Sequence, residues 1–182
     1  HRSIRKGFPE VIFGQGKMPS QVASLSIALL ENTDRLIVTR ASPEMFSSVS
    51  SIIPDANYDT LAKTIVVDRR DSVEPIHGIV VASAGTADQP VAQEAIITCE
   101  IMDCTPTPLL DVGVAGIHRL LENVEIVQQA TVIVVVAGME GALPSVVSGL
   151  VKAPVIAVPT SIAPRVFIID LSQPWLASQP IV

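Results

Sequence analysis

Four apolar runs in this sequence are each followed by a short turn of small and polar residues. A carboxylate beside a hydroxyl can hold a substrate or transfer a proton, and an arginine side chain can pair with phosphates. If the runs are parallel strands, their carboxyl ends meet at one edge of a sheet, where open α/β folds bind their ligands. The turns carry Thr86 and Asp88 within SAGTADQP (83–90), His118 and Arg119, Glu140, and finally Thr160 with Ser161.

Each of these side chains also has a purely structural interpretation. Thr86 or Asp88 could cap the following helix, with Pro90 in its first turn, where a missing N–H costs nothing. His118 falls in the first turn of its helix, where the dipole favours a neutral imidazole, so a structural and a catalytic role both stay open. The convergence of four such turns on one edge favours a functional site more than any single turn does.

Glu140 occupies the third turn, between Gly138 and Gly141. Glycines at these positions would let a substrate approach the backbone closely. A carboxylate that is partly desolvated there could transfer a proton. The alternative is a first-turn carboxylate that stabilises its helix through the dipole.

From residue 78 onward, apolar runs alternate with helical patterns. Short turns between them imply right-handed crossovers and a parallel sheet. The unbroken aliphatic character of the runs favours a sheet that is buried on both faces. The sequence therefore predicts an α/β fold with three layers, α/β/α, and a mainly parallel, flavodoxin-like sheet. Strands are expected at 78–82, 108–112, 131–136 and 154–158, and helices at about 91–102, 117–129 and from Leu143.

The first 70 residues are less regular. Strands are expected at 10–13, 35–39 and 64–67, with a helix at about 19–30 and a short helix from Pro43. The charged DRRD (68–71) is a plausible boundary. It separates a leading strand-helix-strand segment (1–70) from a second domain (71–161), which is followed by a divergent tail (162–182). A last strand could form at 166–169.

Gly14-Gln15-Gly16 follows a strand and precedes a helix, as a dinucleotide-binding turn does. Pro19 stands where that fingerprint needs its third glycine, and no acidic residue ends the next strand. The turn is therefore interpreted as structural, with incidental phosphate affinity through its amides and Lys17. The pair Arg69-Arg70 is expected to be a solvated boundary, although arginines there could reach phosphates.

Composition argues against several classes of protein. A net charge of -6 and a pI of about 4.9 disfavour nucleic acid as a partner. No apolar run approaches the roughly 20 residues that span a bilayer, and HRSIRKGFPE shows no secretory signal. Cys99 and Cys104 are too few for a disulfide scaffold and lack zinc-site spacing, and Cys99 is expected to be a small core residue. A reducing, cytoplasmic location is expected, or a plastid if a transit peptide has been lost.

Five blocks occur in a fixed order: GFPEVIFGQGK (7–17), SAGTADQPVAQEA (83–95), DVGVAGIHRLL (111–121), AGMEGALPSVVSGLV (137–151) and PVIAVPTS (154–161). Together they resemble the LarB family, whose core is similar to the aminoimidazole ribonucleotide carboxylase (PurE) domain. That broader family has a Gly-Ser-x-Ser-Asp turn where this chain has residues 84–88. The resemblance covers about residues 1–161 and implies a PurE-like fold for the second domain.

The resemblance implies an enzyme that acts on nicotinic acid adenine dinucleotide. The pyridinium ring is carboxylated at C5 by carbon dioxide or bicarbonate, and the phosphoanhydride is hydrolysed to release AMP, which begins synthesis of the nickel-pincer nucleotide cofactor. No cofactor is implied, although Mg²⁺ could accompany the phosphates. Glu140 and Asp88 are the implied catalytic residues. The implied substrate-binding residues are Ser83, Gly85, Thr86, His118, Arg119, Gly138, Met139 and Ser161.

After VPTS the family continues with a glycine-rich turn, a helix and an Asn-Ser-Cys segment whose cysteine is the ring nucleophile. This chain instead reads IAPR (162–165) and has no cysteine after Cys104. We therefore expect it to bind the dinucleotide but to carboxylate it poorly or not at all. Two alternatives stay open. One is an aminoimidazole ribonucleotide carboxylase or mutase of purine biosynthesis, against which the GFPEVIFGQGK block argues, and the other is a truncated, non-catalytic subunit of this family.

The expected partners are the small-molecule dinucleotide and further copies of the chain. Relatives of this fold are commonly oligomeric, and a mean hydropathy of +0.49 is consistent with large buried interfaces. Neither nucleic acid nor a membrane is expected to bind.

Overall fold

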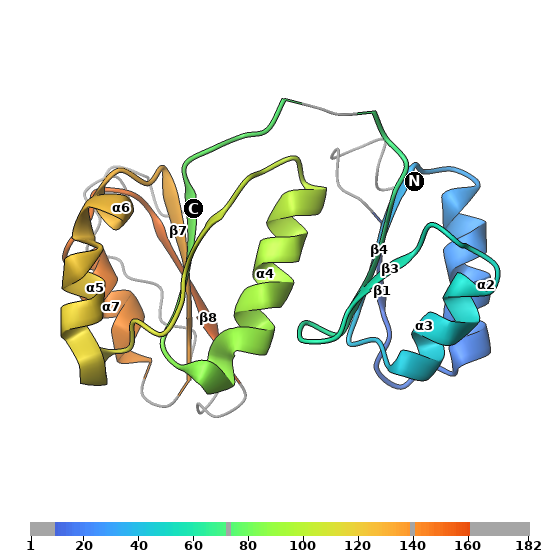
Figure 1. The fold of residues 1–182 in the computed structure, drawn as a ribbon, viewed down its shortest axis with the longest axis horizontal. Helices are drawn as coiled ribbons and strands as arrows, with labels where there is room; N and C mark the ends of the chain where they lie inside the picture. Colours follow the sequence, from blue (N-terminus) through green and yellow to red (C-terminus); the bar gives the residue numbers. More distant parts are fainter. Residues whose placement is uncertain (1–9, 72–73, 139–140, 161–182) are drawn as a thin grey trace, which may run out of the picture. The chain divides into compact units, whose positions relative to one another are not determined.

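A computed structural model describes residues 10–71, 74–138 and 141–160 (Figure 1). The chain forms two compact units, one from His1–Ile76 with Ile97–Cys104 and the other from His77–Ile96 with Thr105–Val182. Each unit contains a four-stranded sheet. The expected strand at 166–169 and the divergent tail lie outside the described residues.

The sheet of the second unit is entirely parallel, as the alternation of strands and helices predicts. Its strand order is β6-β5-β7-β8. The chain leaves β5 toward β6 but leaves β7 toward β8, so the direction of winding reverses between β5 and β7. Open α/β sheets bind ligands at such a reversal. The strands are β5 (Ile79–Ser83), β6 (Thr107–Leu109), β7 (Val132–Ala137) and β8 (Val155–Pro159).

Helices cover both faces of this sheet, because its strands are apolar on both sides. Val80 and Ala82 of β5 pack with Leu120 and Leu143 in one core cluster, whereas Val81 packs with α4 on the opposite face. Figure 1 shows α4 on one side of β7 and β8, with α5 and α7 on the other. The predicted three-layer, flavodoxin-like PurE fold is thus confirmed. The helices are α4 (Gln89–Ile101), α5 (Ile117–Glu122), α6 (Val124–Gln128) and α7 (Ala142–Ser148).

Two elements of this unit differ from their predicted extents by more than a shift of one or two residues. The strand expected at 108–112 ends at Leu109, and Asp111 adopts a left-handed conformation with φ 60°. The helix expected at 117–129 breaks into α5 and α6 at Asn123, whose φ of -111° is not helical. The Asn123 side chain donates to the Arg119 carbonyl at 2.8 Å, and such local bonds compete with a continuous helix.

The first unit has a mixed sheet of order β1-β2-β4-β3, in which β1 is parallel to β2 and the other pairs are antiparallel. Strand β3 was not predicted from the sequence, because it is short and polar. Its Tyr58 ring stacks on Phe46 with ring centroids 5.2 Å apart. Helices α2 (Pro19–Leu30) and α3 (Pro43–Ser50) lie together on one face of the sheet (Figure 1). The strands are β1 (Glu10–Phe13), β2 (Arg35–Thr39), β3 (Asn57–Asp59) and β4 (Thr64–Asp68).

The opposite face of the first sheet is covered by the end of α4. Ile37 and Ala62 form one apolar cluster with Ile97 and Ile101. Arg35 also donates a hydrogen bond to the Ile101 carbonyl, in the last turn of α4, at 2.8 Å. These contacts give the final residues of α4 a structural role in the first unit.

The boundary arginines are paired with carboxylates. Arg69 makes two bonds to Asp55, at 2.7 and 3.0 Å, and both side chains are largely exposed. Arg70 is more shielded and bonds Asp68 and Asp103. Only Arg69 therefore has the solvated position expected for the pair. The helices of the described residues include none with the length and apolar character that crossing a bilayer requires.

Candidate active site

Asp88 is buried in the turn that follows β5, with 6% of its surface exposed. The turn continues as a short 3₁₀ helix, Thr86–Asp88, which leads directly into α4. The Gly85 N–H donates to Asp88 Oδ2 at 3.0 Å, and the Thr160 hydroxyl donates to Oδ1 at 2.9 Å. Both carboxylate oxygens thus accept a hydrogen bond from within the protein, and the side chain is held in one orientation.

Thr160 fixes the end of β8 to this turn. Its N–H donates to the Ala137 carbonyl at the end of β7, at 3.1 Å, and its side chain is buried. The bond from Thr160 to Asp88 therefore joins the carboxyl ends of β8 and β5, which lie on either side of β7. Thr160 was predicted at this edge from the sequence, but its pairing with Asp88 was not.

Ser83, the last residue of β5, is fully buried and positions the turn after β6. Its hydroxyl accepts from the Asp111 N–H at 3.4 Å, and its carbonyl accepts from the Val112 N–H at 3.0 Å. Gly113 then donates to the Ala84 carbonyl at 2.8 Å. A Cβ atom at position 113 would lie 2.6 Å from that carbonyl oxygen, so only glycine permits this approach. The two turns are therefore neighbours.

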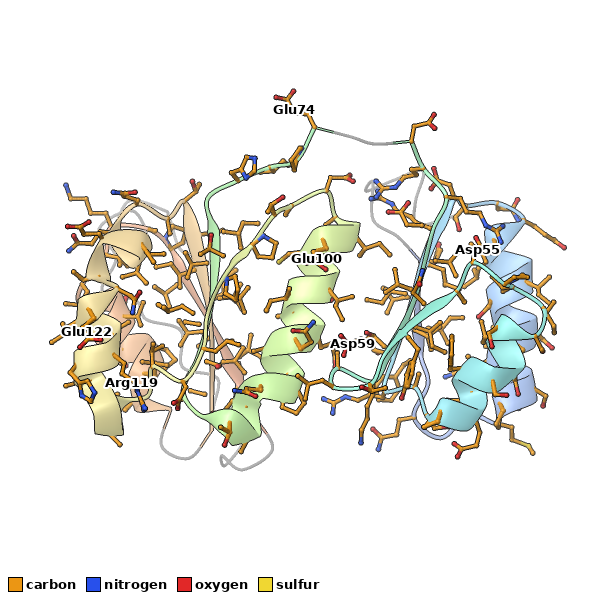
Figure 2. All side chains as sticks on the ribbon, viewed as in Figure 1. Asp55, Asp59, Glu74, Glu100, Arg119 and Glu122 are labelled. Carbon is orange, nitrogen blue, oxygen red and sulfur yellow. The ribbon has the colours of Figure 1, made fainter. Side chains whose placement is uncertain are left out.

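Arg119 lies in the first turns of α5, near the beginning of the helix in Figure 2. Its Nη1 pairs with Asp111 Oδ2 at 2.9 Å, and nearly half of each side chain stays exposed. The guanidinium packs over Gly116, where a Cβ atom would lie 2.7 Å from Nη2. Its Nε is buried and has no hydrogen-bond partner among the described residues. This arrangement fixes the guanidinium while leaving part of it open to an anion.

The remaining predicted residues differ in how the structure presents them. Thr86 and His118 are exposed, whereas Gly85 is partly buried beside Asp88. Gly138 accepts from the Gly141 N–H at 3.1 Å, and Gly141 begins α7 with φ 64°. Met139, Glu140 and Ser161 lie outside the described residues. The described part of the predicted site thus centres on the turn from Ser83 to Asp88.

Asp111 and Gly113 were not among the predicted site residues. Both lie in the DVGVAGIHRLL block, and an aspartate two residues before a glycine after a strand is a signal for a turn with positive φ. Their partners, Arg119 and Ala84, could not have been read from that signal. The sequence alone gives no indication that the loops after β5 and β6 approach so closely.

The Gly14-Gln15-Gly16 turn has a structural explanation in the first unit. A Cβ atom at Gly14 would lie 2.9 Å from the Thr39 carbonyl oxygen, and Gly16 has φ 82°. Lys17 Nζ donates to the Phe13 carbonyl at 2.7 Å. A hollow of about 450 Å³ adjoins this turn and is lined by Lys17, Ser20, Gln21, Ser24 and Leu25. None of the predicted substrate-binding residues lines it.

No group of three or more His, Cys, Asp or Glu side chains in the described residues is placed to hold a metal ion. The described residues of the candidate site in the second unit include an ion pair between Asp111 and Arg119. They also include the Asp88 carboxylate, each oxygen of which accepts a hydrogen bond from within the protein. Of these groups, the partly exposed Arg119 guanidinium is the one whose charge suits the binding of an anionic substrate group.

Two known families match separate parts of the chain. Residues 1–70 match a family model described as the LarB/PurE-like N-terminal domain, and residues 78–170 match the AIR carboxylase model. An uncharacterized protein of Methanocaldococcus jannaschii is 39% identical over 171 residues, which cover 88% of this chain and 66% of that relative. The chain thus spans about two thirds of the relative's length.

Proposed function

We propose that this chain, which belongs to the LarB/PurE-like family, has a carboxylase-type function and acts on the pyridinium ring of nicotinic acid adenine dinucleotide. The observation that supports a substrate site is the Asp88 turn. Its carboxylate is fixed by Gly85 and Thr160 at the point where the winding of the parallel sheet reverses.

The proposed reaction has a clear chemical requirement. A pyridinium ring is electron-poor and cannot attack carbon dioxide directly. A nucleophile must first add to the ring, which gives an enamine-like carbon that forms the new C–C bond at C5. A base then removes the C5 proton, the nucleophile leaves with its electron pair, and water cleaves the phosphoanhydride to release AMP.

We assign the described residues to binding this substrate. Asp88 holds the turn in shape, so that the exposed Thr86 hydroxyl and the Gly85 backbone can contact the nicotinate. Arg119 and His118 are proposed to contact the phosphates, because the guanidinium is fixed by Asp111 yet nearly half exposed. Arginine is well suited to such pairing.

Glu140 is proposed to transfer the C5 proton, with Gly138, Met139 and Ser161 beside the substrate and Ser83 supporting the turn. A direct catalytic role for Asp88 is also proposed. Each Asp88 oxygen has a second lone pair beside the one that accepts from the Gly85 N–H or the Thr160 hydroxyl, and the substrate would contact that second lone pair. Mg²⁺ could accompany the phosphates, and no other cofactor is proposed.

The ring nucleophile is the missing part of this scheme. The two cysteines of these 182 residues are Cys99 and Cys104, and neither belongs to a strand-end turn of the second sheet. We therefore expect residues 1–182 to bind the dinucleotide and to carboxylate it slowly or not at all. Expected partners are the dinucleotide and other copies of the chain, in the cytoplasm or a plastid.

Calorimetry with nicotinic acid adenine dinucleotide, together with ¹⁴C-bicarbonate incorporation, tests the proposal on the full chain. We expect measurable binding, with incorporation at or near background. Thr86→Ala and Arg119→Gln should each weaken binding, and Arg69→Gln, which changes an arginine of the other unit, is the matched control. Absence of binding, or an equal effect of Arg69→Gln, would contradict the assignment of the site.

A second candidate is carboxylation of aminoimidazole ribonucleotide, favoured by the AIR carboxylase match over 78–170. Its substrate carbon is already enamine-like, so no cysteine nucleophile is needed. The same incorporation assay with this ribonucleotide distinguishes the two. Turnover of the ribonucleotide without affinity for the dinucleotide would favour the second candidate, whereas binding without turnover of either would favour a non-catalytic subunit.

A further inference from the structure

The two cysteines of the chain lie at opposite ends of one tight turn that ends α4. The Cys104 N–H donates to the Cys99 carbonyl at 3.0 Å, and the Asp103 N–H donates to the Glu100 carbonyl at 3.0 Å. Asp103 is left-handed, with φ 65°. These two hydrogen bonds and the left-handed residue define a Schellman motif, in which Cys99 is the C3 residue and Cys104 is the C″ residue.

This motif brings the two side chains together. Side chains at C3 and C″ commonly contact each other, because the chain reverses over the last turn of the helix. A disulfide requires Cα atoms that are roughly 4.4 to 6.8 Å apart, a range that residues joined by such a hydrogen bond can reach without unwinding the helix. Cys99 was expected to be a small core residue, but its burial is only intermediate, and so is that of Cys104.

The position of Cys104 is fixed from both sides of its backbone. Ile76 forms a parallel bridge with Cys104, and the Ile76 N–H donates to the Asp103 carbonyl at 2.8 Å. The Cys104 thiol donates to the Met102 carbonyl at 3.5 Å, which directs Sγ back toward the helix end. The thiol thus lies over the turn that also carries Cys99.

We propose that Cys99 and Cys104 form a reversible intramolecular disulfide, so that the end of α4 is a thiol–disulfide site that responds to small disulfides such as glutathione disulfide. The chain has no other cysteine that could compete for either partner. Disulfides that do form in proteins of reducing compartments are usually transient, with catalytic or redox-sensing roles.

The exchange proceeds in two balanced steps. The Cys104 thiolate attacks one sulfur of glutathione disulfide, which forms a mixed disulfide and releases one glutathione. The Cys99 sulfur then attacks Cys104 Sγ, which forms the Cys99–Cys104 bond and releases the second glutathione. The two thiols lose two protons and two electrons in total, which reduce one glutathione disulfide to two glutathiones.

The surroundings of Cys99 favour this order. Burial, the adjacent Cys104 and Glu100 all raise the pKa of the Cys99 thiol. Its thiolate is therefore scarce at neutral pH, and a thiolate is the attacking species. Cys99 is thus suited to resolve a mixed disulfide that is already held beside it.

The full chain can be titrated with glutathione mixtures, quenched with acid and N-ethylmaleimide, and cleaved after glutamate. Glu100 lies between the two cysteines, so cleavage gives peptides 95–100 and 101–122, each with one cysteine. We expect an oxidised protein in which these peptides stay linked until a reductant is added, with a 19.3 kDa band on a non-reducing gel. Separate alkylated peptides at every ratio, or a covalent dimer, would overturn the proposal.

Variants test the attack order and the geometry. Cys99→Ser should retain glutathione on Cys104, whereas Cys104→Ser should retain little on Cys99; the reverse pattern would contradict the order. Asp103→Gly and Asp103→Val both remove the carboxylate, but of the two new residues only glycine adopts a φ of 65° without strain. The valine variant should need an about tenfold higher ratio of oxidised to reduced glutathione than the glycine variant to form the disulfide, since a left-handed β-branched residue is strained. Equal behaviour of both variants would show that the turn does not align the thiols.

Discussion

At the level of single residues, the hydrogen bonds of Asp88 predict how its variants unfold. Asp88→Ala leaves the Gly85 N–H and the Thr160 hydroxyl without their acceptor, and should lower the free energy of unfolding by about 1 to 3 kcal/mol. Asp88→Asn should have a smaller effect. Its amide oxygen can accept from Gly85, and its NH₂ group can donate to the Thr160 hydroxyl oxygen after that hydroxyl rotates.

Urea denaturation measures both Asp88 effects, and Thr86→Ala is the control in the same turn. Thr86 is exposed, so the alanine variant should stay within about 0.5 kcal/mol of the parent. If Thr86→Ala destabilised the protein as much as Asp88→Ala, the stability of the turn would not depend on the buried carboxylate.

Two glycines of the site give a second prediction, because they differ in the space around them. Alanine at position 113 would place its Cβ atom 2.6 Å from the Ala84 carbonyl oxygen, and the backbone must shift, at a cost of about 1 to 3 kcal/mol. Alanine at position 85 would meet Asp88 Oδ2 at 3.8 Å, an ordinary contact, on extended backbone. Gly85→Ala should therefore fold normally.

Urea denaturation of both variants, with dinucleotide calorimetry on Gly85→Ala, distinguishes a packing role from a binding role. Only Gly113→Ala is expected to lose stability, and only Gly85→Ala is expected to lose affinity at unchanged stability. Equal destabilisation by the two substitutions would contradict the packing argument.

The position of the candidate site could be predicted from the sequence, but the hydrogen bonds between its residues could not. Polar residues after apolar runs identify the turn that holds Asp88, because strand ends share one edge in a parallel sheet. The partner of Asp88 lies 72 residues further along the chain, and no local pattern encodes that pairing. Thr160 was therefore predicted at the edge without its bond, and Asp111 was not identified at all.

At the scale of elements, the carboxylates that Arg70 bonds near the end of α4 should make the stability of the fold depend on pH. Hydrogen bonds from Arg70 hold the pKa values of Asp103 and Asp68 below their usual 3.8, and burial opposes this shift. A carboxyl whose pKa is lower in the folded state contributes stability above its unfolded pKa and loses it as pH falls through the folded pKa. The free energy of unfolding should therefore fall steadily below about pH 4.

Arg70→Met should flatten this acid dependence and lower the free energy of unfolding at pH 7 by about 1.5 to 3 kcal/mol. Arg69→Met is the matched control, since its ion pair with Asp55 is largely exposed and should contribute at most about 1 kcal/mol. Denaturation at pH values from 2 to 7 compares the two. A loss for Arg69→Met equal to that for Arg70→Met would contradict the greater contribution of the shielded pair.

Elements with a strong hydrophobic period were predicted well, and those determined by local hydrogen bonds were not. Strand 10–13 and helix 19–30 were predicted with the bounds that β1 and α2 have. Asn123 interrupts a continuous apolar period because its side chain bonds the Arg119 carbonyl, and β3 is too short and polar to show a period. Propensity alone does not encode either feature.

At the scale of the whole molecule, charge and hydropathy act against each other in self-association. The chain has a net charge of -6, which opposes the contact of identical copies, yet its mean hydropathy of +0.49 favours buried interfaces. Apolar side chains that are more than one third exposed in the second unit include Leu110, Leu121, Ile126 and Ile156. Their burial between copies would not be weakened by salt, whereas the repulsion would be screened.

We therefore expect an oligomer whose mass is a multiple of 19.3 kDa and whose dissociation becomes weaker as salt rises. Light scattering coupled to gel filtration, over a range of protein concentrations and at low and high sodium chloride, measures both quantities. Dissociation that strengthens with salt would show that ion pairs hold the copies together. A mass of one chain under all conditions would contradict the proposed oligomer, and the binding site in each copy would then have to act alone.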